Sequence, residues 1–266
     1  MDLSWQNWVQ ENIERGCDTA TIRDILLEHN FSLPVIKNAM GDKYPEDKAI
    51  EAELVDYEAL AKVNITKIAQ AIETNLLQLY ILEDFLSEQE SDELVDLINI
   101  RLRPSTVTTE KIDKYFRTSS TCDLTFLKNP LVQEIENKIS QALGINLSYS
   151  EGIQAQRYDV GQEFKAHTDY FEPRTDEYKK FASVQGNRTW TFMIYLNNTS
   201  QGGGTKFVKL GKTFYPKKGM AVVWNNLYPD GTPNPDTLHW GLPVEQGVKV
   251  IITKWFREKG SGEMIF

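Results

Sequence analysis

Short apolar runs of β type alternate with turns from about residue 150 onward, and this pattern limits the fold more than any other feature of the chain. The runs are IQAQRYDV, RTWTFMIYLNN, TKFVKL, KTFYP, MAVVWNN and VKVIITKWF. Breaks rich in glycine and proline separate them, as in SQGGG, PKKG and YPDGTPNP. Many short strands with such breaks predict a β-sandwich or a barrel.

The first third of the chain has helical rather than β spacing. Three short helical patterns in residues 1–44 predict a small N-terminal module. Residues 45–75 are expected to be a helical linker or support, with one longer helix over residues 57–73. Residues 76–266 then form the β-rich domain, which begins with an apolar β run and a helix capped by Ser87. The predicted fold class is α+β.

The charge and the composition make several kinds of partner unexpected. A net charge of −9 and a pI near 5.0 argue against broad binding to nucleic acids or anionic membranes. No run approaches the roughly 18 apolar residues of a membrane span, and the N-terminus lacks the layout of a secretory signal. The two cysteines, Cys17 and Cys122, suggest no disulfide framework. We therefore expect a cytoplasmic protein with no nucleic-acid or membrane partner.

His167 and Asp169 stand two positions apart in FKAHTDYF, in a chain with only three histidines. Residues two apart in an extended strand project to the same face, so both side chains can point into a barrel mouth. One imidazole and one carboxylate cannot hold a catalytic metal alone. His29 lies in the helical N-terminal part, whereas His239 begins a strand of the β-rich region. His239 is therefore the candidate third ligand.

Two histidines and one carboxylate fit two kinds of metal site. Bound facially, they leave three coordination positions open, as in non-haem Fe(II) oxygenases. With a water molecule they also describe zinc hydrolases. The ligand types alone leave both metals open.

Lys249 lies inside the apolar run VKVIITKWF, ten residues after His239. A lysine in that position is costly unless its ammonium meets an anion. Thr205, which follows a glycine run, and Tyr158 add two hydroxyl groups. The three side chains suit the distal carboxylate of a dicarboxylate that chelates the metal. This expectation assumes a tight hairpin at residues 245–247, which would set His239 and Lys249 ~13 Å apart.

The order of several motifs resembles that of the prolyl 4-hydroxylase family over about residues 76–258. The motifs include RYDVGQEFKAHTDYF, RTWTFMIYLNN, GGGTKF, PKKGMAVVWNN and LHWGLPVEQGVKVIITKWFRE. Members of this family are Fe(II)- and 2-oxoglutarate-dependent dioxygenases. The resemblance implies a double-stranded β-helix (jelly-roll) core with flanking helices, Fe(II) as cofactor, and 2-oxoglutarate and O2 as cosubstrates. Ascorbate is a candidate further cofactor on the same grounds.

The resemblance also implies a role for each candidate residue. The iron ligands correspond to His167, Asp169 and His239. Lys249 corresponds to the lysine that pairs with the C5 carboxylate of 2-oxoglutarate, with Tyr158 and Thr205 as hydrogen-bonding partners. Arg188 corresponds to an arginine that binds the substrate peptide, and Trp255 to an aromatic residue beside the site.

The chain departs from the family pattern at two places. The usual GGET segment is GGGT here, which removes a carboxylate. Trp240 replaces a small residue after the distal histidine, and we expect it either to narrow the pocket or to pack behind it.

The leading hypothesis is a prolyl 4-hydroxylase that acts on a proline residue of an intracellular protein, with N-terminal helices that dock a protein partner. An aspartate at position 169, rather than a small residue, favours hydroxylation over halogenation. One alternative is a hydroxylase of a free amino acid or another small molecule. A second is a binding module that keeps the fold but has lost catalysis, and a third is a zinc hydrolase.

Overall fold

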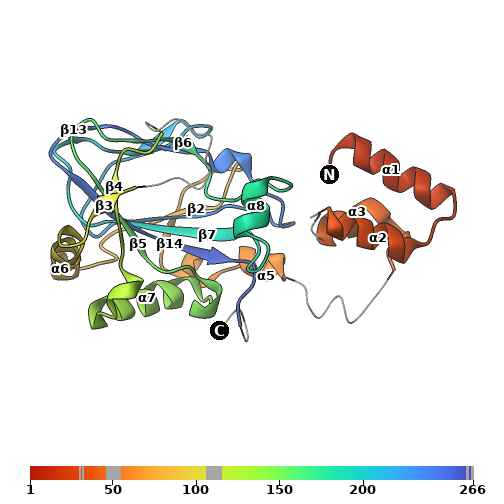
Figure 1. Ribbon diagram of the computed structural model, residues 1–266, viewed down its shortest axis with the longest axis horizontal. Helices are drawn as coiled ribbons and strands as arrows, with labels where there is room; N and C mark the ends of the chain where they lie inside the picture. Colours follow the sequence, from red (N-terminus) through yellow and green to blue (C-terminus); the bar gives the residue numbers. More distant parts are fainter. Residues whose placement is uncertain (30, 32, 46–54, 106–115, 262–263, 265–266) are drawn as a thin grey trace.

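The computed structural model describes residues 1–29, 31, 33–45, 55–105, 116–261 and 264, and its two large antiparallel sheets lie face to face (Figure 1). The major sheet has the strand order β1-β2-β11-β7-β14-β5-β4-β3. In chain order these strands are β1 (Gln70–Ala71), β2 (Leu79–Leu82), β3 (Arg103–Pro104), β4 (Ser120–Asp123), β5 (Gln154–Tyr158), β7 (Arg188–Tyr195), β11 (Ala221–Asn225) and β14 (Lys249–Arg257). The minor sheet runs β10 (Lys212–Phe214), β9 (Thr205–Phe207), β12 (His239–Gly241), β6 (Phe164–His167). A further pair joins β13 (Val244–Gln246) to β8 (Gln201–Gly202).

The central strand β7 is buried on both faces, which explains its nearly uninterrupted apolar sequence. Alternate side chains of a strand point to opposite faces. One set packs in the main core with helices α6 (Glu88–Asn99) and α7 (Pro130–Leu143); its members are Trp190, Phe192 and Ile194. The other set includes Met193 and Tyr195, which pack with Phe207 of the minor sheet. Figure 1 shows α7 below the major sheet and β6 above it, so the second set lines the interior of a sandwich.

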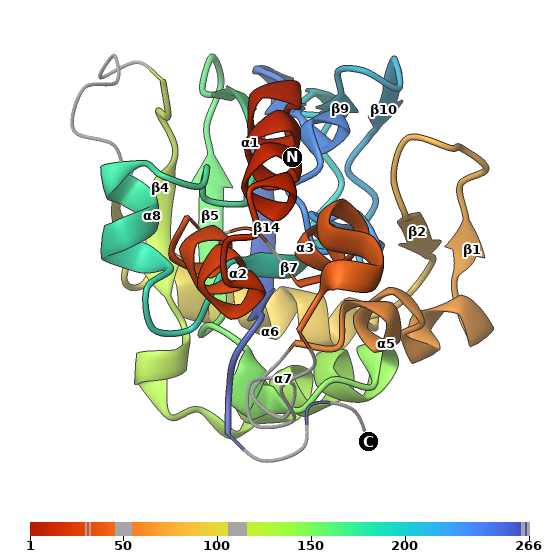
Figure 2. The ribbon, with the colours of Figure 1, turned by 90° about the vertical axis from the view of Figure 1, so that its right-hand side faces the viewer.

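The three helices predicted in the N-terminal module are confirmed as α1 (Leu3–Glu14), α2 (Thr19–Glu28) and α3 (Leu33–Met40). They enclose a small hydrophobic cluster of their own around Leu26 and Ile36. In Figure 2 they lie in front of one end of the sandwich. The domain boundaries at residues 44 and 75 stay predictions, and residues 46–54 of the charged link lie outside the described residues.

The single helix predicted over residues 57–73 is wrong. The segment instead contains three short elements, namely α5 (Tyr57–Ala61), the 3-10 turn η2 (Asn64–Lys67) and β1. Val63 and Ile65 are buried in the main core, and Gln70 and Ala71 pair with the edge strand β2. These tertiary contacts outweigh the helical spacing, which is only a weak preference by itself. Residues 45–75 are therefore not purely helical.

The other elements are short and the predicted α+β class is confirmed. Ser87 forms the predicted cap of α6 as a capping box with Glu90. The remaining helical turns are η1 (Gly41–Lys43), η3 (Thr125–Leu127), η4 (Leu147–Tyr149), α8 (Asp176–Phe181) and η5 (Pro235–Thr237). Within the described residues, every helix is too short or too polar to cross a membrane.

Candidate metal centre and adjoining cavity

The side chains of His167, Asp169 and His239 meet between the two sheets. His167 ends β6, His239 begins β12, and antiparallel pairing sets the two residues opposite each other. Oδ1 of Asp169 lies 3.7 Å from Nε2 of His167 and 3.9 Å from Nε2 of His239. Ligand atoms that share one ion at about 2.1 Å are roughly 3 to 4 Å apart. The structure therefore brings the three predicted ligands together in an arrangement that fits a metal ion.

Backbone carbonyls orient both imidazole rings. Nδ1 of His167 lies 2.7 Å from the carbonyl oxygen of Lys165, and Nδ1 of His239 lies 3.0 Å from that of Thr237. A carbonyl only accepts, so each Nδ1 carries the proton and donates it. Each Nε2 is left with its lone pair facing Asp169, which is the tautomer that a metal requires.

The protonation states also suit a metal site. Burial, with a contribution from His239, lowers the pKa of His167 to about 3, so its ring is neutral at pH 7. Burial alone would raise the pKa of Asp169, but His239, His167 and Arg188 lower it by more. The site therefore offers a carboxylate and a neutral imidazole, the forms that bind metals.

Lys249 begins β14 with its side chain inside the sandwich, where it is 1% exposed. Its Nζ lies 3.5 Å from Oγ1 of Thr205 and 5.0 Å from the ring centroid of Tyr158. Burial lowers the pKa of Lys249 to about 7, and no carboxylate in the described part of the chain forms an ion pair with it. A buried ammonium without a counter-ion is unfavourable, so the pocket around Lys249 suits an anion.

The assumed hairpin between His239 and Lys249 is wrong. His239 lies in β12 of the minor sheet, whereas Lys249 lies in β14 of the major sheet opposite Tyr158 of β5. The intervening strand β13 pairs with β8 and with neither of these strands. The metal triad and Lys249 therefore face each other across the interior, and packed sheets are about 10 Å apart.

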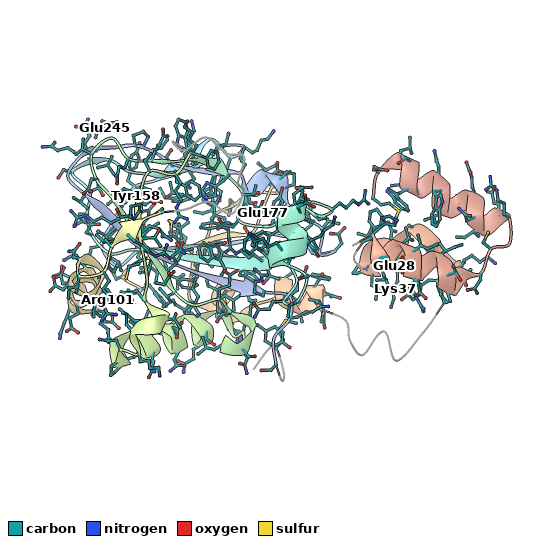
Figure 3. All side chains as sticks on the ribbon, in the orientation of Figure 1. Glu28, Lys37, Arg101, Tyr158, Glu177 and Glu245 are labelled. Atoms are coloured by element: carbon teal, nitrogen blue, oxygen red, sulfur yellow. The ribbon has the colours of Figure 1, made fainter. Side chains whose placement is uncertain are left out.

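One cavity of about 700 Å³ contains all eight candidate residues. These residues are Tyr158, His167, Asp169, Arg188, Thr205, His239, Lys249 and Trp255. Glu177 of α8 also lines the cavity, and Figure 3 shows it far from Tyr158, toward the N-terminal helices. The short helix α8 therefore forms part of the cavity wall.

Arg188 and Trp255 form one wall of this cavity. The guanidinium of Arg188 lies 4.0 Å from the ring centroid of Trp255 and makes two hydrogen bonds, of 2.6 and 2.8 Å, to the carboxylate of Glu151. Glu151 also accepts from Arg257 at 2.8 Å. The indole N–H of Trp255 donates to Oδ2 of Asp169 at 2.9 Å. Arg188 is thus fixed in the cavity wall by Glu151 and is not a surface cation. Trp255 contacts a candidate metal ligand directly.

Two partly buried residues near the site were not predicted from the sequence, and one position was left open. No role was assigned to Glu151 or Arg117, because their partners lie on distant strands. Arg117 also lines the cavity, 4.8 Å from the ring centroid of Phe164. Trp240 does not belong to the described lining, and its indole N–H donates to Glu163 at 2.8 Å, so it packs behind the pocket.

Comparison with known proteins relates this site to one family. A family model for the 2OG-Fe(II) oxygenase superfamily matches residues 153–257. Human prolyl 4-hydroxylase subunit alpha-1 is 34% identical over 182 residues, which are 66% of this chain and 34% of that protein. Probable prolyl 4-hydroxylase 4 of Arabidopsis thaliana is 33% identical over 218 residues, which are 73% of this chain and 71% of that protein. The chain belongs to the prolyl 4-hydroxylase family.

A solved structure of a prolyl hydroxylase agrees with the fold. A viral collagen prolyl hydroxylase from Paramecium bursaria Chlorella virus-1, in complex with 2OG, superposes with a TM-score of 0.54 and 25% identity. The match covers 67% of this chain and 95% of that one. The predicted jelly-roll core is thus confirmed. The chain spans only about a third of the length of the subunit alpha-1 relatives.

Membership of the prolyl 4-hydroxylase family implies Fe(II), 2-oxoglutarate and O2, and it favours iron over zinc. The residues present fit these groups. The triad supplies a two-histidine, one-carboxylate donor set. The ammonium of Lys249, which has no carboxylate partner among the described residues, suits the distal carboxylate of 2-oxoglutarate. Ascorbate binding stays a prediction.

The affinity for 2-oxoglutarate is expected to fall as the pH rises above about 7. Burial lowers the pKa of Lys249 to about 7, so above that pH the anion must bind together with a proton. The apparent Kd should be nearly constant below about pH 6 and rise about tenfold per pH unit above about pH 7.5. Isothermal titration calorimetry with Mn²⁺ in place of Fe(II) measures this. A Kd that stays constant up to about pH 9 would contradict it.

Proposed function

We propose that this chain is an Fe(II)- and 2-oxoglutarate-dependent hydroxylase that adds a hydroxyl group at C4 of a proline residue in an intracellular protein. The observation that carries the proposal is a single cavity that contains both the metal triad and the buried Lys249. Relatives that are named as prolyl 4-hydroxylases support proline as the substrate.

Bound Fe(II) and 2-oxoglutarate supply the oxidation, in which O2, 2-oxoglutarate and a C–H bond give succinate, CO2 and a C–OH group. The chain supplies binding, orientation and exclusion of water. The metal would be held by Nε2 of His167, Oδ1 of Asp169 and Nε2 of His239. The distal carboxylate of 2-oxoglutarate would be bound by Lys249, Thr205 and Tyr158.

Arg188 is the residue that we propose for binding the substrate peptide. Its Nη1 donates to the main-chain carbonyl of Asp169 at 3.4 Å, whereas Nε and Nη2 are occupied by Glu151. Glu151 thus holds the guanidinium in the cavity wall, with Nη1 directed at the main-chain carbonyl of Asp169. A peptide carbonyl of a substrate offers the same kind of acceptor.

We also propose that the N-terminal helices dock the protein that carries this proline. Arg174 follows Glu172, which lines the cavity, and its guanidinium lies 4.7 Å from the ring centroid of Phe31 and 5.4 Å from that of Trp5. Its Nε also donates to the carbonyl of His29 at 3.5 Å. The contact joins the N-terminal helices to a segment of the cavity wall, which supports a role in presenting substrate.

The substrate is tested by comparing cells that contain the protein with cells that contain the Asp169→Ala variant. We expect a +16 Da shift on a proline residue of at least one protein in the first cells only, measured by mass spectrometry. The same shift on a small metabolite instead would favour the small-molecule alternative. An intact protein that forms no succinate with any extract would favour the binding module.

The Arg174→Ala variant tests the proposed role of the N-terminal helices with the identified protein substrate. Loss of a cation–π contact should lower kcat/KM for that protein roughly fivefold. The rate at which 2-oxoglutarate is consumed in the absence of substrate should stay unchanged. Arg174 is not among the described residues that line the cavity. An unchanged kcat/KM would contradict the docking role.

A further inference from the structure

A chain of buried hydrogen bonds ends on one oxygen of Asp169. The indole N–H of Trp224 donates to Oδ1 of Asn226 at 2.9 Å, and Nδ2 of Asn226 donates to Oγ1 of Thr191 at 2.8 Å. The hydroxyl of Thr191 donates to Oδ2 of Asp169 at 2.8 Å. Trp255 donates to the same oxygen at 2.9 Å. Asp169 Oδ2 therefore receives two hydrogen bonds.

The direction of this chain follows from the chemistry of its first member. An indole nitrogen can only donate, so the amide oxygen of Asn226 must face Trp224 and the amide NH2 must face Thr191. The hydroxyl of Thr191 accepts that bond, and its single proton is then free to reach Asp169. A carboxylate can only accept. Each bond in the chain is thus oriented toward Asp169, whichever way hydrogen atoms are first placed.

The strand register makes the arrangement rigid. Thr191 of β7 is the register partner of Trp224 on β11 and of Trp255 on β14. The three side chains therefore form a row across three adjacent strands on the inner face of the major sheet. Thr191 and Asn226 are each 0% exposed, so water cannot replace either one. Buried polar groups that are fully paired are held in one geometry.

Both donors bind Oδ2, whereas Oδ1 is the oxygen that faces Nε2 of His167 and of His239. We propose that Thr191, oriented by Asn226, and Trp255 are positioning residues that restrict Asp169 to one-oxygen binding of the metal. A carboxylate that bound through both oxygens would occupy one of the positions that a facial triad leaves open. The residues thus keep open the positions that 2-oxoglutarate and O2 need. The need for open positions rests on the proposed function. The restriction of Asp169 to one-oxygen binding concerns the metal alone.

Co²⁺ binding to the full chain tests the restriction without 2-oxoglutarate or substrate. Trp255→Phe keeps an aromatic ring beside Arg188 and removes the N–H donor, and Thr191→Val removes the hydroxyl at nearly constant volume. Loss of a hydrogen bond to a ligand typically lowers metal affinity 10- to 100-fold. We expect each variant to bind Co²⁺ at least about tenfold more weakly and to show a changed visible absorption spectrum of bound Co²⁺. Thr191→Ser, which keeps the hydroxyl, should stay within about twofold of the original protein.

Trp190→Phe is the matched control. Trp190 is likewise a buried tryptophan, in the same strand as Thr191, but its N–H donates to the carbonyl of Leu60 at 3.0 Å. The Trp190→Phe variant should bind Co²⁺ with the original affinity and show the original absorption spectrum. The proposal is overturned if Trp255→Phe and Thr191→Val bind Co²⁺ as the original protein does, or if Trp190→Phe loses as much affinity as they do. Failure of the proposed hydroxylation would instead leave all the Co²⁺ results as expected.

Discussion

Replacing His167 by alanine will lower succinate formation from 2-oxoglutarate by roughly a thousandfold or more. The variant keeps one imidazole and one carboxylate of the triad, and these cannot hold the metal in a facial arrangement. Loss of the metal removes several kcal/mol of stabilisation of the transition state, and each 1.36 kcal/mol corresponds to tenfold in rate. The measurement is succinate formation at saturating Fe(II), together with Co²⁺ titration of the same preparation.

His29→Ala is the control for this prediction because His29 is the histidine outside the candidate site. Its ring packs 4.7 Å from the ring of Trp5 in the N-terminal helices. Succinate formation without substrate should stay within about twofold of the original rate, since surface substitutions have small effects. Turnover that survives in His167→Ala would show that the triad does not hold the catalytic metal.

Lys249→Met is expected to weaken 2-oxoglutarate binding roughly a hundredfold, since removal of one member of a buried charge pair costs about 2–5 kcal/mol. The same change should stabilise the ligand-free protein, because Lys249 is buried there and no carboxylate of the described residues pairs with it. The two effects have opposite signs, so simple unfolding cannot produce both. The measurements are the Kd of 2-oxoglutarate with Mn²⁺ and the Tm of the ligand-free protein at pH 6.

Lys254→Met provides the matched control in the same strand. Lys254 is also buried, but its Nζ lies 2.9 Å from Glu136 and 2.8 Å from the carbonyl of Glu151. Its loss leaves a carboxylate without its partner, so Tm should fall while the affinity for 2-oxoglutarate stays unchanged. If Lys249→Met keeps the original affinity, another cation of the cavity, such as Arg117, binds the anion instead.

Local elements were predictable where the sequence encodes a local contact. Ser87 and Glu90 cap α6 across three residues, and Gly41 ends α3 in a left-handed conformation. The helix predicted over residues 57–73 does not form, because the apolar residues of this segment pack against distant parts of the chain. Its last residues form the edge of a sheet rather than another helical turn. Spacing alone cannot distinguish burial on a helix face from burial by separate short elements.

The candidate ligands were predictable because the composition leaves few choices. With three histidines in the chain and one of them in the N-terminal helices, His167 and His239 were the two available imidazoles. The hairpin predicted between His239 and Lys249 was wrong, although a short connection usually favours one. The strand between them instead pairs with β8, and the two residues end in different sheets.

By itself the sequence determined which groups meet, namely two imidazoles, one carboxylate and one lysine that needs an anion. Only the tertiary structure decided how Asp169 is presented. The two oxygens of a carboxylate are chemically equivalent, so the sequence cannot distinguish them. The hydrogen bonds that distinguish them come from Thr191 and Trp255 on separate strands. Those donors reach Oδ2 because β7 and β14 pair in one particular register. Long-range register depends on packing of the whole sheet, so no local pattern in the sequence reports it.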